Sequence, residues 1–421
     1  TCVNEGCTPT KTMIASGRVA HLVQRAADYG IDCKDVVVDM ERIRQRKRDI
    51  VTMFRTGSTK SVNSVDGVDL IYGDARFVGQ KSLTVELNDG GAMTCDADWI
   101  FINTGTRATS PSIDGIDSVP ILDSTSIMEL DHVPHHLVVL GGGYIGVEFG
   151  QLFRRLNSKV TLIHRGEQLL AHEDSDIADE VAKIFRDDGI EVLLQSTATR
   201  IRKMGNDIEV ELSGQGREIT ARGTHLLVAT GRRPNTDTLN CEATGVQLTD
   251  RGFVEVNDRL ETSADGIWAM GDVNGGPAFT HISYDDGRLL RTNLLEGGDR
   301  STDGRLVPYT VFMDPQLGRI GPTEKELRAQ GREFAVAKMP MSKVARALET
   351  DETRGVMKAL VDPTTEQILG AAILGVEGGE IAGGIQLAMM GNLPYTAIRD
   401  GVFSHPTLTE SLNSLFASIE A

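Results

Sequence analysis

The segment Leu137-Val-Val-Leu-Gly-Gly-Gly-Tyr-Ile-Gly146 decides the fold of this chain. Its four apolar residues predict a short buried strand, and residues 147–163 then predict a helix and a second strand. In a strand–turn–helix of this kind, Gly141 permits the tight turn and Gly143 lets the backbone approach a pyrophosphate. Gly146 lets the helix pack close to the strand. An ordinary βα turn is the alternative, but the strand before the motif and the helix after it favour a dinucleotide site.

The residues that end the second strand indicate the type of dinucleotide. NAD sites usually carry Asp or Glu there to bind the ribose hydroxyls, whereas NADP sites replace it and add Arg. This chain has His164-Arg165 and no carboxylate until Glu167. We therefore predict that Arg165, helped by His172, binds a 2′-phosphate, and that NADPH is preferred over NADH.

The bulk composition excludes several classes of function. The chain has 421 residues, enough for two to four domains, with 40% hydrophobic and 24% charged residues. Its formal net charge of −17 argues against nucleic acid or an anionic membrane as a partner. Five scattered cysteines do not form a secreted disulfide framework, and the sequence shows neither a signal peptide nor a long apolar run. We expect a cytoplasmic protein.

Two cysteines lie five residues apart in the first segment of the chain, Cys2 and Cys7. Thr8 is a plausible N-cap and the following proline a plausible first helical residue, with Gly30 ending the helix. Cys7 would then lie at the positive end of the helix dipole, which favours a thiolate, and Lys11 adds a cation one turn further on. Three interpretations are open for this pair: ordinary cysteines, half of a zinc site, or a redox pair. No second Cys/His pair follows at zinc spacing.

The whole segment Thr1-Cys-Val-Asn-Glu-Gly-Cys-Thr-Pro-Thr-Lys11 resembles the redox-active segment of the flavin-dependent pyridine nucleotide–disulfide oxidoreductases. Lipoamide dehydrogenase, glutathione reductase and mercuric reductase belong to this family. Residues 262–272 resemble its second FAD motif, in which the residue matching Asp272, after Gly271, binds a ribityl hydroxyl of the flavin. Two further strands run into Gly105 and Gly231, where the family's FAD and NAD(P) segments end.

The resemblance covers essentially the whole chain and implies an α/β fold. It implies two Rossmann-like nucleotide-binding domains, for FAD and NAD(P), and a C-terminal α+β dimerisation domain. The expected segments are 1–110 (FAD domain with the redox disulfide), 111–236 (NAD(P) domain), 237–305 (second FAD segment) and 306–421 (dimerisation).

In the family, a strand, a Gly-rich turn and a helix that hold the ADP half of FAD precede the cysteine segment. No such unit precedes Thr1, so we expect this sequence to be a fragment or a trimmed chain. A flavin-free NAD(P)-binding or structural remnant is therefore the alternative of another class.

The resemblance also assigns roles to individual residues. Cys7 would be the thiol next to the flavin, and Cys2 the outer thiol that exchanges with substrate. Lys11 would pair with Glu148 beside the flavin, although a solvent-facing carboxylate is the alternative for Glu148. Tyr144 would cover the nicotinamide pocket.

A histidine and a glutamate near the C-terminus, His405 and Glu410, have two interpretations. Thr407-x-x-Glu410 is a capping box, so Glu410 would bond the start of its own helix. Alternatively, Glu410 orients His405 as a general acid–base. In disulfide-reducing members of the family, this pair reaches the active site of the other subunit, which implies a homodimer. We favour catalysis, and the two roles are compatible.

The substrate is a disulfide or a soft metal ion in this interpretation. The phrase Gly-Cys-Thr-Pro-Thr-Lys and the C-terminal domain look most like the mercuric-reductase-like branch. True mercuric reductases carry a C-terminal cysteine pair, whereas this chain has no cysteine after Cys241. A reduced dithiol still binds soft metal ions. Dihydrolipoamide dehydrogenase is the alternative, because His405 and Glu410 suit a dithiol substrate.

Overall fold

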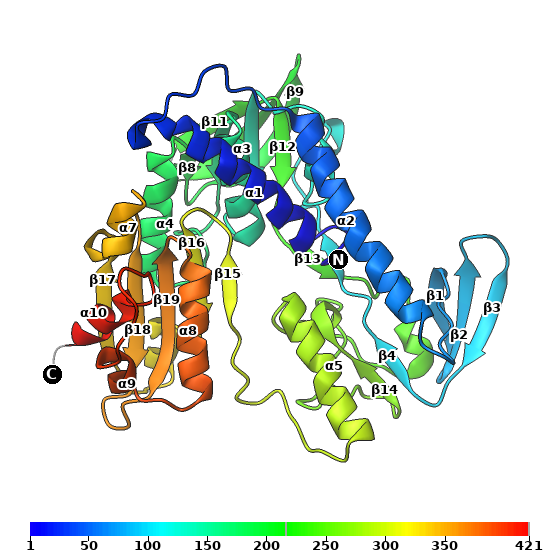
Figure 1. Ribbon diagram of the computed structural model, residues 1–421. Coiled ribbons are helices and arrows are strands. Elements are labelled where there is room, and N and C mark those ends of the chain that lie inside the picture. The colour runs from blue at the N-terminus through cyan, green and yellow to red at the C-terminus, as the bar shows by residue number, and fades with distance from the viewer. Residues whose placement is uncertain (215–216, 420–421) are drawn as a thin grey trace. The chain divides into compact units, whose positions relative to one another are not determined.

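The computed structural model describes residues 1–214 and 217–419 and divides the chain into two compact units (Figure 1). The first unit contains residues 1–10, 46–110 and 231–305. The second contains residues 11–45, 111–230 and the chain from Leu306 onward. Both units mix helices with sheets, which confirms the predicted α/β class. In the part of the chain described, no helix is both long and apolar enough to cross a membrane.

Helix α1 (Cys7–Gln24) starts and ends earlier than predicted. Thr8 is not the N-cap, because its own N–H donates to the carbonyl of Cys2 at 3.0 Å. The turn before the helix thus supplies backbone acceptors for the first helical N–H groups. The helix ends at Gln24, and Gly30, with a φ of 74°, ends a separate 3₁₀ turn η1 (Ala26–Tyr29).

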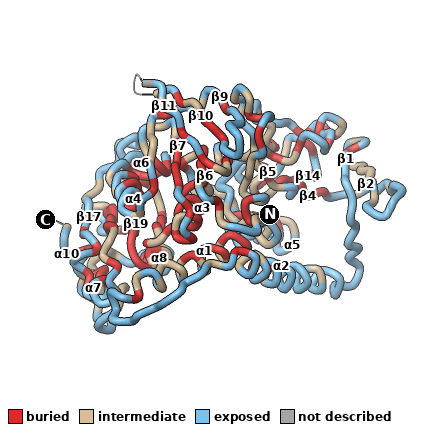
Figure 2. The backbone as a smooth tube through the Cα atoms, turned by 90° about the horizontal axis from the view of Figure 1, so that it is seen from above, coloured by how far each residue is buried: buried red, intermediate tan, exposed pale blue. Residues whose placement is uncertain are grey.

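Helix α2 (Met40–Asn63) follows a capping aspartate. Asp39 Oδ1 accepts the N–H of Arg42 at 3.0 Å, which satisfies one of the donors left free at a helix start. Most of its later turns are exposed, as the pale blue of this helix shows in Figure 2.

Three small sheets and helix α5 (Thr280–Leu295) make up most of the first unit. The largest sheet is an antiparallel meander of three strands. The other two each pair a strand near residue 100 with a strand beyond residue 230, and so join distant parts of the sequence. The strands are β1 (Gly73–Gly79), β2 (Ser82–Leu87), β3 (Ala92–Asp96), β4 (Ile100–Ile102) with β14 (Ile267–Ala269), and β5 (Thr106–Ala108) with β13 (Arg232–Pro234).

A four-stranded parallel sheet of order β12-β6-β7-β8 organises residues 111–230 of the second unit. Leucines, valines and isoleucines fill its central strands, as expected for a parallel sheet covered on both faces (Figure 2). An antiparallel sheet of β9, β10 and β11 follows it in the chain. The elements are β6 (His136–Leu140), α3 (Tyr144–Arg155), β7 (Lys159–Ile163), α4 (Ser175–Asp187), β8 (Glu191–Leu193), β9 (Thr197–Met204), β10 (Asp207–Gly214), β11 (Arg217–Gly223) and β12 (His225–Val228).

The C-terminal region forms a five-stranded antiparallel sheet of order β15-β16-β19-β18-β17. Helix α8 packs against β16 and β19 (Figure 1). Every residue of β18 and β19 is buried, which places the core of this region at the sheet centre. The elements are β15 (Tyr309–Val311), β16 (Gln316–Ile320), α6 (Glu324–Ala329), β17 (Ala335–Pro340), α7 (Ala345–Glu349), β18 (Val356–Val361), β19 (Ile368–Gly375), α8 (Gly378–Met390), α9 (Tyr395–Arg399) and α10 (Ser411–Ala417).

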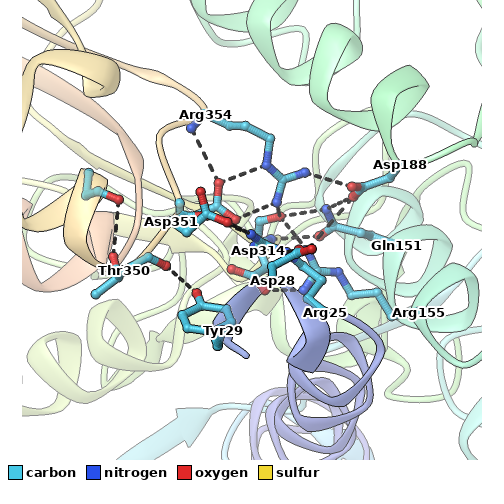
Figure 3. Close-up of polar contacts among 12 residues, drawn as sticks. Arg25, Asp28, Tyr29, Gln151, Arg155, Asp188, Asp314, Thr350, Asp351 and Arg354 are labelled. Atoms are coloured by element: carbon cyan, nitrogen blue, oxygen red, sulfur yellow. Dashed lines mark hydrogen bonds and ion pairs between the residues drawn. The ribbon is translucent and has the colours of Figure 1, made fainter. Parts of the chain in front are cut away.

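A polar network ties α1 and α3 to the C-terminal region inside the second unit (Figure 3). Arg25, just after α1, donates to the carbonyl of Asp351 at 2.9 Å and pairs with its carboxylate. Arg155, the last residue of α3, donates to the carbonyl of Asp314 at 2.9 Å and pairs with its carboxylate. Arg155 is 5% exposed, so this second pair is largely removed from water and depends on both partners.

Candidate active site

Cys2 lies in the turn before α1, and Cys7 begins the helix. Cys7 is the first helical residue, and its Sγ lies 3.3 Å from Oγ1 of Thr280 at the start of α5. The pKa of Cys2 is lowered to about 5; the hydrogen bond from Cys7 is the largest cause, and the hydroxyls of Thr280 and Thr8 act in the same direction, against the opposing effect of burial. A lowered pKa favours the thiolate of Cys2, the form that attacks disulfides and binds soft metals.

Lys11 and Glu148 form an ion pair with 2.6 Å between Nζ and Oε2. Glu148, on α3, is only 5% exposed, and its other oxygen accepts the N–H of Phe312 at 2.8 Å. Lys11 also lies over the Phe312 ring, 4.9 Å from its centroid. The carboxylate is therefore not solvent-facing, and its charge is held at one place against the lysine.

The glycine-rich turn has the shape that a dinucleotide requires. Gly141 has a φ of 116°, and a Cβ there would lie 2.3 Å from the carbonyl oxygen of Ala229. A Cβ on Gly146 would lie 1.9 Å from the carbonyl oxygen of Gly141, so no side chain fits between the helix and the strand there. Around Gly143, by contrast, no atom of the described residues other than those of its chain neighbours comes within 4 Å of such a Cβ. Space is left open at the N-terminus of α3, the place where the sequence predicts a pyrophosphate.

His164 has a role that the sequence did not reveal. Its Nδ1 accepts the N–H of Gly142 at 3.1 Å, so the imidazole is bonded to the glycine-rich turn itself. Burial lowers the pKa of His164, which keeps the ring neutral and able to accept. Arg165 and His172 are both exposed on the segment that follows, while Leu170 of that segment donates its N–H to the carbonyl of Gly142 at 2.8 Å.

The residues predicted to hold the flavin lie in the first unit. Gly105 precedes β5 and Gly231 precedes β13, and these two strands pair with each other. Asp272 Oδ2 accepts the hydroxyl of Thr106 at 3.1 Å, while its Oδ1 accepts no hydrogen bond from the described part of the chain. That oxygen has the chemistry required for a ribityl hydroxyl, so the residues present fit the flavin.

Hydrogen bonds from distant parts of the chain fix the backbone at Gly271 and the side chain of Thr106, on either side of Asp272. Gly271 has a φ of 70° and donates its N–H to the buried Asp286 at 2.8 Å. Arg232 Nε donates to the hydroxyl of Thr106 at 2.8 Å. Sequence reasoning missed Thr106, Arg232 and Asp286, because their partners are more than 14 residues away in the chain and no local pattern marks them.

His405 and Glu410 are brought together at the C-terminal end. His405 Nδ1 lies 2.9 and 3.0 Å from the two oxygens of Glu410, and its side chain is 68% exposed. This contact lowers the pKa of Glu410. Glu410 also accepts the N–H of Thr407 at 3.4 Å and donates its own N–H to the Thr407 hydroxyl at 3.2 Å. The Thr407–Glu410 bonds and the histidine contact therefore coexist in the turn before α10 (Ser411–Ala417), but the helix itself has no side-chain cap, so the predicted capping role is wrong.

A reactive dithiol at a helix start, together with a glycine-rich nucleotide turn, defines a nucleotide-dependent thiol–disulfide oxidoreductase. Two family models match the sequence: pyridine nucleotide-disulphide oxidoreductase over residues 1–287, and the dimerisation domain of the same enzymes over residues 307–416. The chain belongs to the class I pyridine nucleotide-disulfide oxidoreductase family.

Relatives and a solved structure support this assignment. The chain is 40% identical over 422 residues to the probable pyridine nucleotide-disulfide oxidoreductase RclA of Escherichia coli, covering 100% of this chain and 91% of that protein. It is 36% identical over 416 residues to a mercuric reductase of Bacillus cereus, covering 98% of this chain and 64% of that protein. A Cu(II) complex of the HOCl-induced flavoprotein disulfide reductase RclA from Escherichia coli superposes with a TM-score of 0.89 at 39% identity, covering 100% and 91% of the two chains.

These comparisons confirm the predicted family, its α/β fold and its oxidoreductase class. The chain is a member of the flavoprotein disulfide reductases, which use FAD and a nicotinamide cofactor, and its dimerisation domain indicates a homodimer. The four domain segments and the roles of the individual site residues stay predictions.

Proposed function

We propose that this protein is a cytoplasmic, homodimeric, NADPH-dependent flavoprotein that reduces a disulfide or a soft metal ion through the Cys2–Cys7 dithiol. The observation that carries the proposal is the cysteine pair at the start of α1, where Cys7 Sγ lies 3.3 Å from the Thr280 hydroxyl and the pKa of Cys2 is lowered by hydrogen bonds from Cys7 and from two hydroxyls. A structural cysteine pair has no need of a thiolate at neutral pH, whereas a thiol-exchange enzyme depends on one.

Bound FAD supplies a two-electron relay between the nicotinamide and the cysteine pair. Asp272, Gly271 and Gly105 would hold it, with Asp272 offering its unengaged Oδ1. Lys11 and Glu148 form a fixed charge pair whose proposed role is to set the electrostatics at the flavin edge.

The dithiol performs the exchange with substrate in two steps. The Cys2 thiolate attacks one sulfur of a substrate disulfide, which forms a mixed disulfide and releases the first thiolate. Cys7 then attacks Cys2, which releases the second thiol and forms the Cys2–Cys7 disulfide. NADPH supplies the two electrons, and with one further proton the balance is one disulfide reduced to two thiols for each NADPH oxidised. With a metal ion, the same two sulfurs act as soft ligands.

His405 handles the proton of the leaving thiol in this proposal. Glu410 accepts from Nδ1, which fixes the tautomer and leaves Nε2 directed away from the pair. Because the His405 side chain is largely exposed in the single chain, it is available to the active site of the partner subunit.

The relatives, the cysteine content and one contact bear on the substrate. The solved relative was studied as a Cu(II) complex, and another relative is a mercuric reductase, which favours a soft metal ion or a disulfide. Residues 242–421 contain no cysteine. The His405–Glu410 contact favours thiol chemistry and keeps dihydrolipoamide oxidation as the second candidate.

Arg165 supports the preference for NADPH. His164 Nδ1 accepts the N–H of Gly142, so His164 is already used by the turn. The neighbouring Arg165 is exposed, and its guanidinium can bind a 2′-phosphate. A charged hydrogen bond contributes about 1.5–3 kcal/mol, and exposure reduces this. Arg165→Ala should therefore raise the KM for NADPH roughly tenfold and leave the KM for NADH unchanged. An equal change for both nucleotides would contradict the assignment.

Steady-state rates with NADPH and NADH against lipoamide, glutathione disulfide, Hg(II) and Cu(II) test the function. We expect a yellow protein whose turnover with a disulfide or a metal ion stops in both Cys2→Ser and Cys7→Ser. A strong lipoamide rate with NAD(H) alone would make it a dihydrolipoamide dehydrogenase. A colourless chain that binds NADPH and reduces none of these acceptors would make it a flavin-free nucleotide-binding protein.

A further inference from the structure

Two histidine rings meet at the amino-terminal edge of the parallel sheet in the second unit. His132 lies in the segment that leads into β6, and His225 is the first residue of β12, the strand that pairs with β6. Their ring centroids are 5.4 Å apart at an interplanar angle of 64°. The His132 side chain is 62% exposed, so the fold brings two imidazoles from distant parts of the sequence to one place at the surface.

The ring of His132 is held in one tautomer. Asp131 Oδ1 lies 2.6 Å from its Nδ1, and an ionised carboxylate only accepts, so Nδ1 carries the proton. In a neutral imidazole the other nitrogen, Nε2, then has the free lone pair. A carboxylate in this position orients the ring and raises the basicity of the free nitrogen, as it does for histidines that bind metal ions.

Thr224 fixes the same tautomer in His225. The Thr224 hydroxyl has one proton, which it donates to the carbonyl of His136 at 3.1 Å. Towards His225 Nδ1, 3.0 Å away, the hydroxyl can therefore only accept, so this nitrogen is also protonated. The hydroxyl accepts the N–H of His136 at 3.2 Å as well, which ties it to the sheet. Both rings thus have an unprotonated Nε2, and no hydrogen bond reaches either one from residues 1–214 or 217–419.

The separation of the two rings matches that of two ligands on one ion. A metal–nitrogen bond is about 2.1 Å long and the nitrogen lies about 1.1 Å from the ring centre, so each centroid lies about 3.2 Å from the ion. Two such rings have centroids about 5.2 Å apart in a tetrahedral arrangement and about 6.4 Å apart on opposite sides of the ion. The observed 5.4 Å lies within this range.

We propose that His132 and His225 form a two-histidine site for a divalent transition-metal ion, with Cu(II) bound most tightly. Imidazole nitrogen suits Cu(II), Ni(II) and Zn(II), and the Irving–Williams order places Cu(II) first. Residues 1–214 and 217–419 contain no group of three or more His, Cys, Asp or Glu side chains placed to hold a metal ion, so water completes the coordination. A structural site would be closed by protein ligands, whereas this one leaves positions open for exchange. The site is independent of the proposed reductase function, which uses neither histidine.

Copper titrations followed by electron paramagnetic resonance test the site. The thiols of the purified holoenzyme are first alkylated with iodoacetamide, because free thiols also bind copper. We expect one tight Cu(II) per chain, with two imidazoles counted by spin-echo spectroscopy. Asp131→Asn should weaken the binding roughly tenfold, within the range for a residue that orients a ligand. His132→Ala and His225→Ala each remove a ligand, so each should weaken the binding further and leave one imidazole on the ion.

His135→Ala is the matched control, because it removes another exposed histidine of the same segment. It should change neither the affinity nor the number of imidazoles. Equal weakening in His135→Ala would overturn the proposal, as would a single imidazole on the tight ion in the native protein. Unchanged binding in either His132→Ala or His225→Ala would do the same, since the ion would then not be shared by the two rings.

Discussion

Replacing Cys7 by alanine should change how the reactivity of Cys2 depends on pH. The hydrogen bond from Cys7 is the largest of the effects that lower the pKa of Cys2 from its ordinary 9.0 to about 5. The Cys2 thiol is therefore deprotonated above a pH of about 5, and the thiolate is lost only as the pH falls through that value. Between pH 6 and pH 8 the native thiolate fraction is therefore almost constant.

The ratio of alkylation rates at pH 8 and pH 6 measures this directly and cancels the intrinsic nucleophilicity of the thiolate. For a pKa near 5 the ratio is about 1.1, and for a thiol at 9.0 it is about 90. Thr280 and Thr8 still act in Cys7→Ala, so the pKa returns only part of the way. We expect a ratio above about 10, which corresponds to a pKa of roughly 7 or more.

Iodoacetamide labelling of the reduced protein, followed by peptide mass analysis, gives the rate at Cys2 alone. Protein unfolded in urea should show the ratio of about 90 for an ordinary thiol. Cys33→Ala, which removes an exposed thiol outside the site, is the matched control and should leave the Cys2 ratio unchanged. A ratio near 1.1 in Cys7→Ala, or above 10 in the native protein, would refute the assignment of the thiolate to Cys2 and Cys7.

The glycine-rich turn and the histidine contact give two further predictions. Gly146→Ala should lower both the Tm and the affinity for NADPH, since its Cβ would lie 1.9 Å from the carbonyl oxygen of Gly141, whereas Gly143→Ala should lower only the affinity. Thermal unfolding measures the Tm and calorimetry measures the affinity. An equal fall in Tm for Gly143→Ala would contradict the open space at that position. Glu410→Ala should lower kcat for disulfide reduction roughly tenfold, within the range of general acid–base effects. Reduction of a dye that takes electrons from the flavin should be unaffected, and a parallel loss there would point to misfolding instead.

The sequence predicts features whose cause lies within a few residues. The apolar run before Gly141 and the helix after it predict the glycine-rich strand–turn–helix. The predicted start of α1 was wrong, because Thr8 is already helical and its N–H donates to the carbonyl of Cys2. A backbone turn of that kind has no residue signature.

The contacts that hold the site come from distant parts of the chain and could not be predicted. Glu173 meets Arg319 across 146 positions, and nothing in the sequence near either residue marks the partner. The pairing depends on the register of β15 and β16, which places Tyr309 beside the arginine. Lys11 and Glu148 are 137 positions apart, and only the resemblance to a family indicated that they meet.

The bond between His164 and Gly142 limits how the coenzyme preference of this protein can be re-engineered. The position that selects the ribose in many dinucleotide enzymes here also supports the backbone of the glycine-rich turn, because Nδ1 accepts an amide proton of the turn. If a carboxylate replaced His164 in order to favour NADH, that one side chain would have to accept both the N–H of Gly142 and the ribose hydroxyls. A redesign should therefore begin at Arg165 and retain the imidazole, so that selectivity changes without loosening the turn that all dinucleotides share.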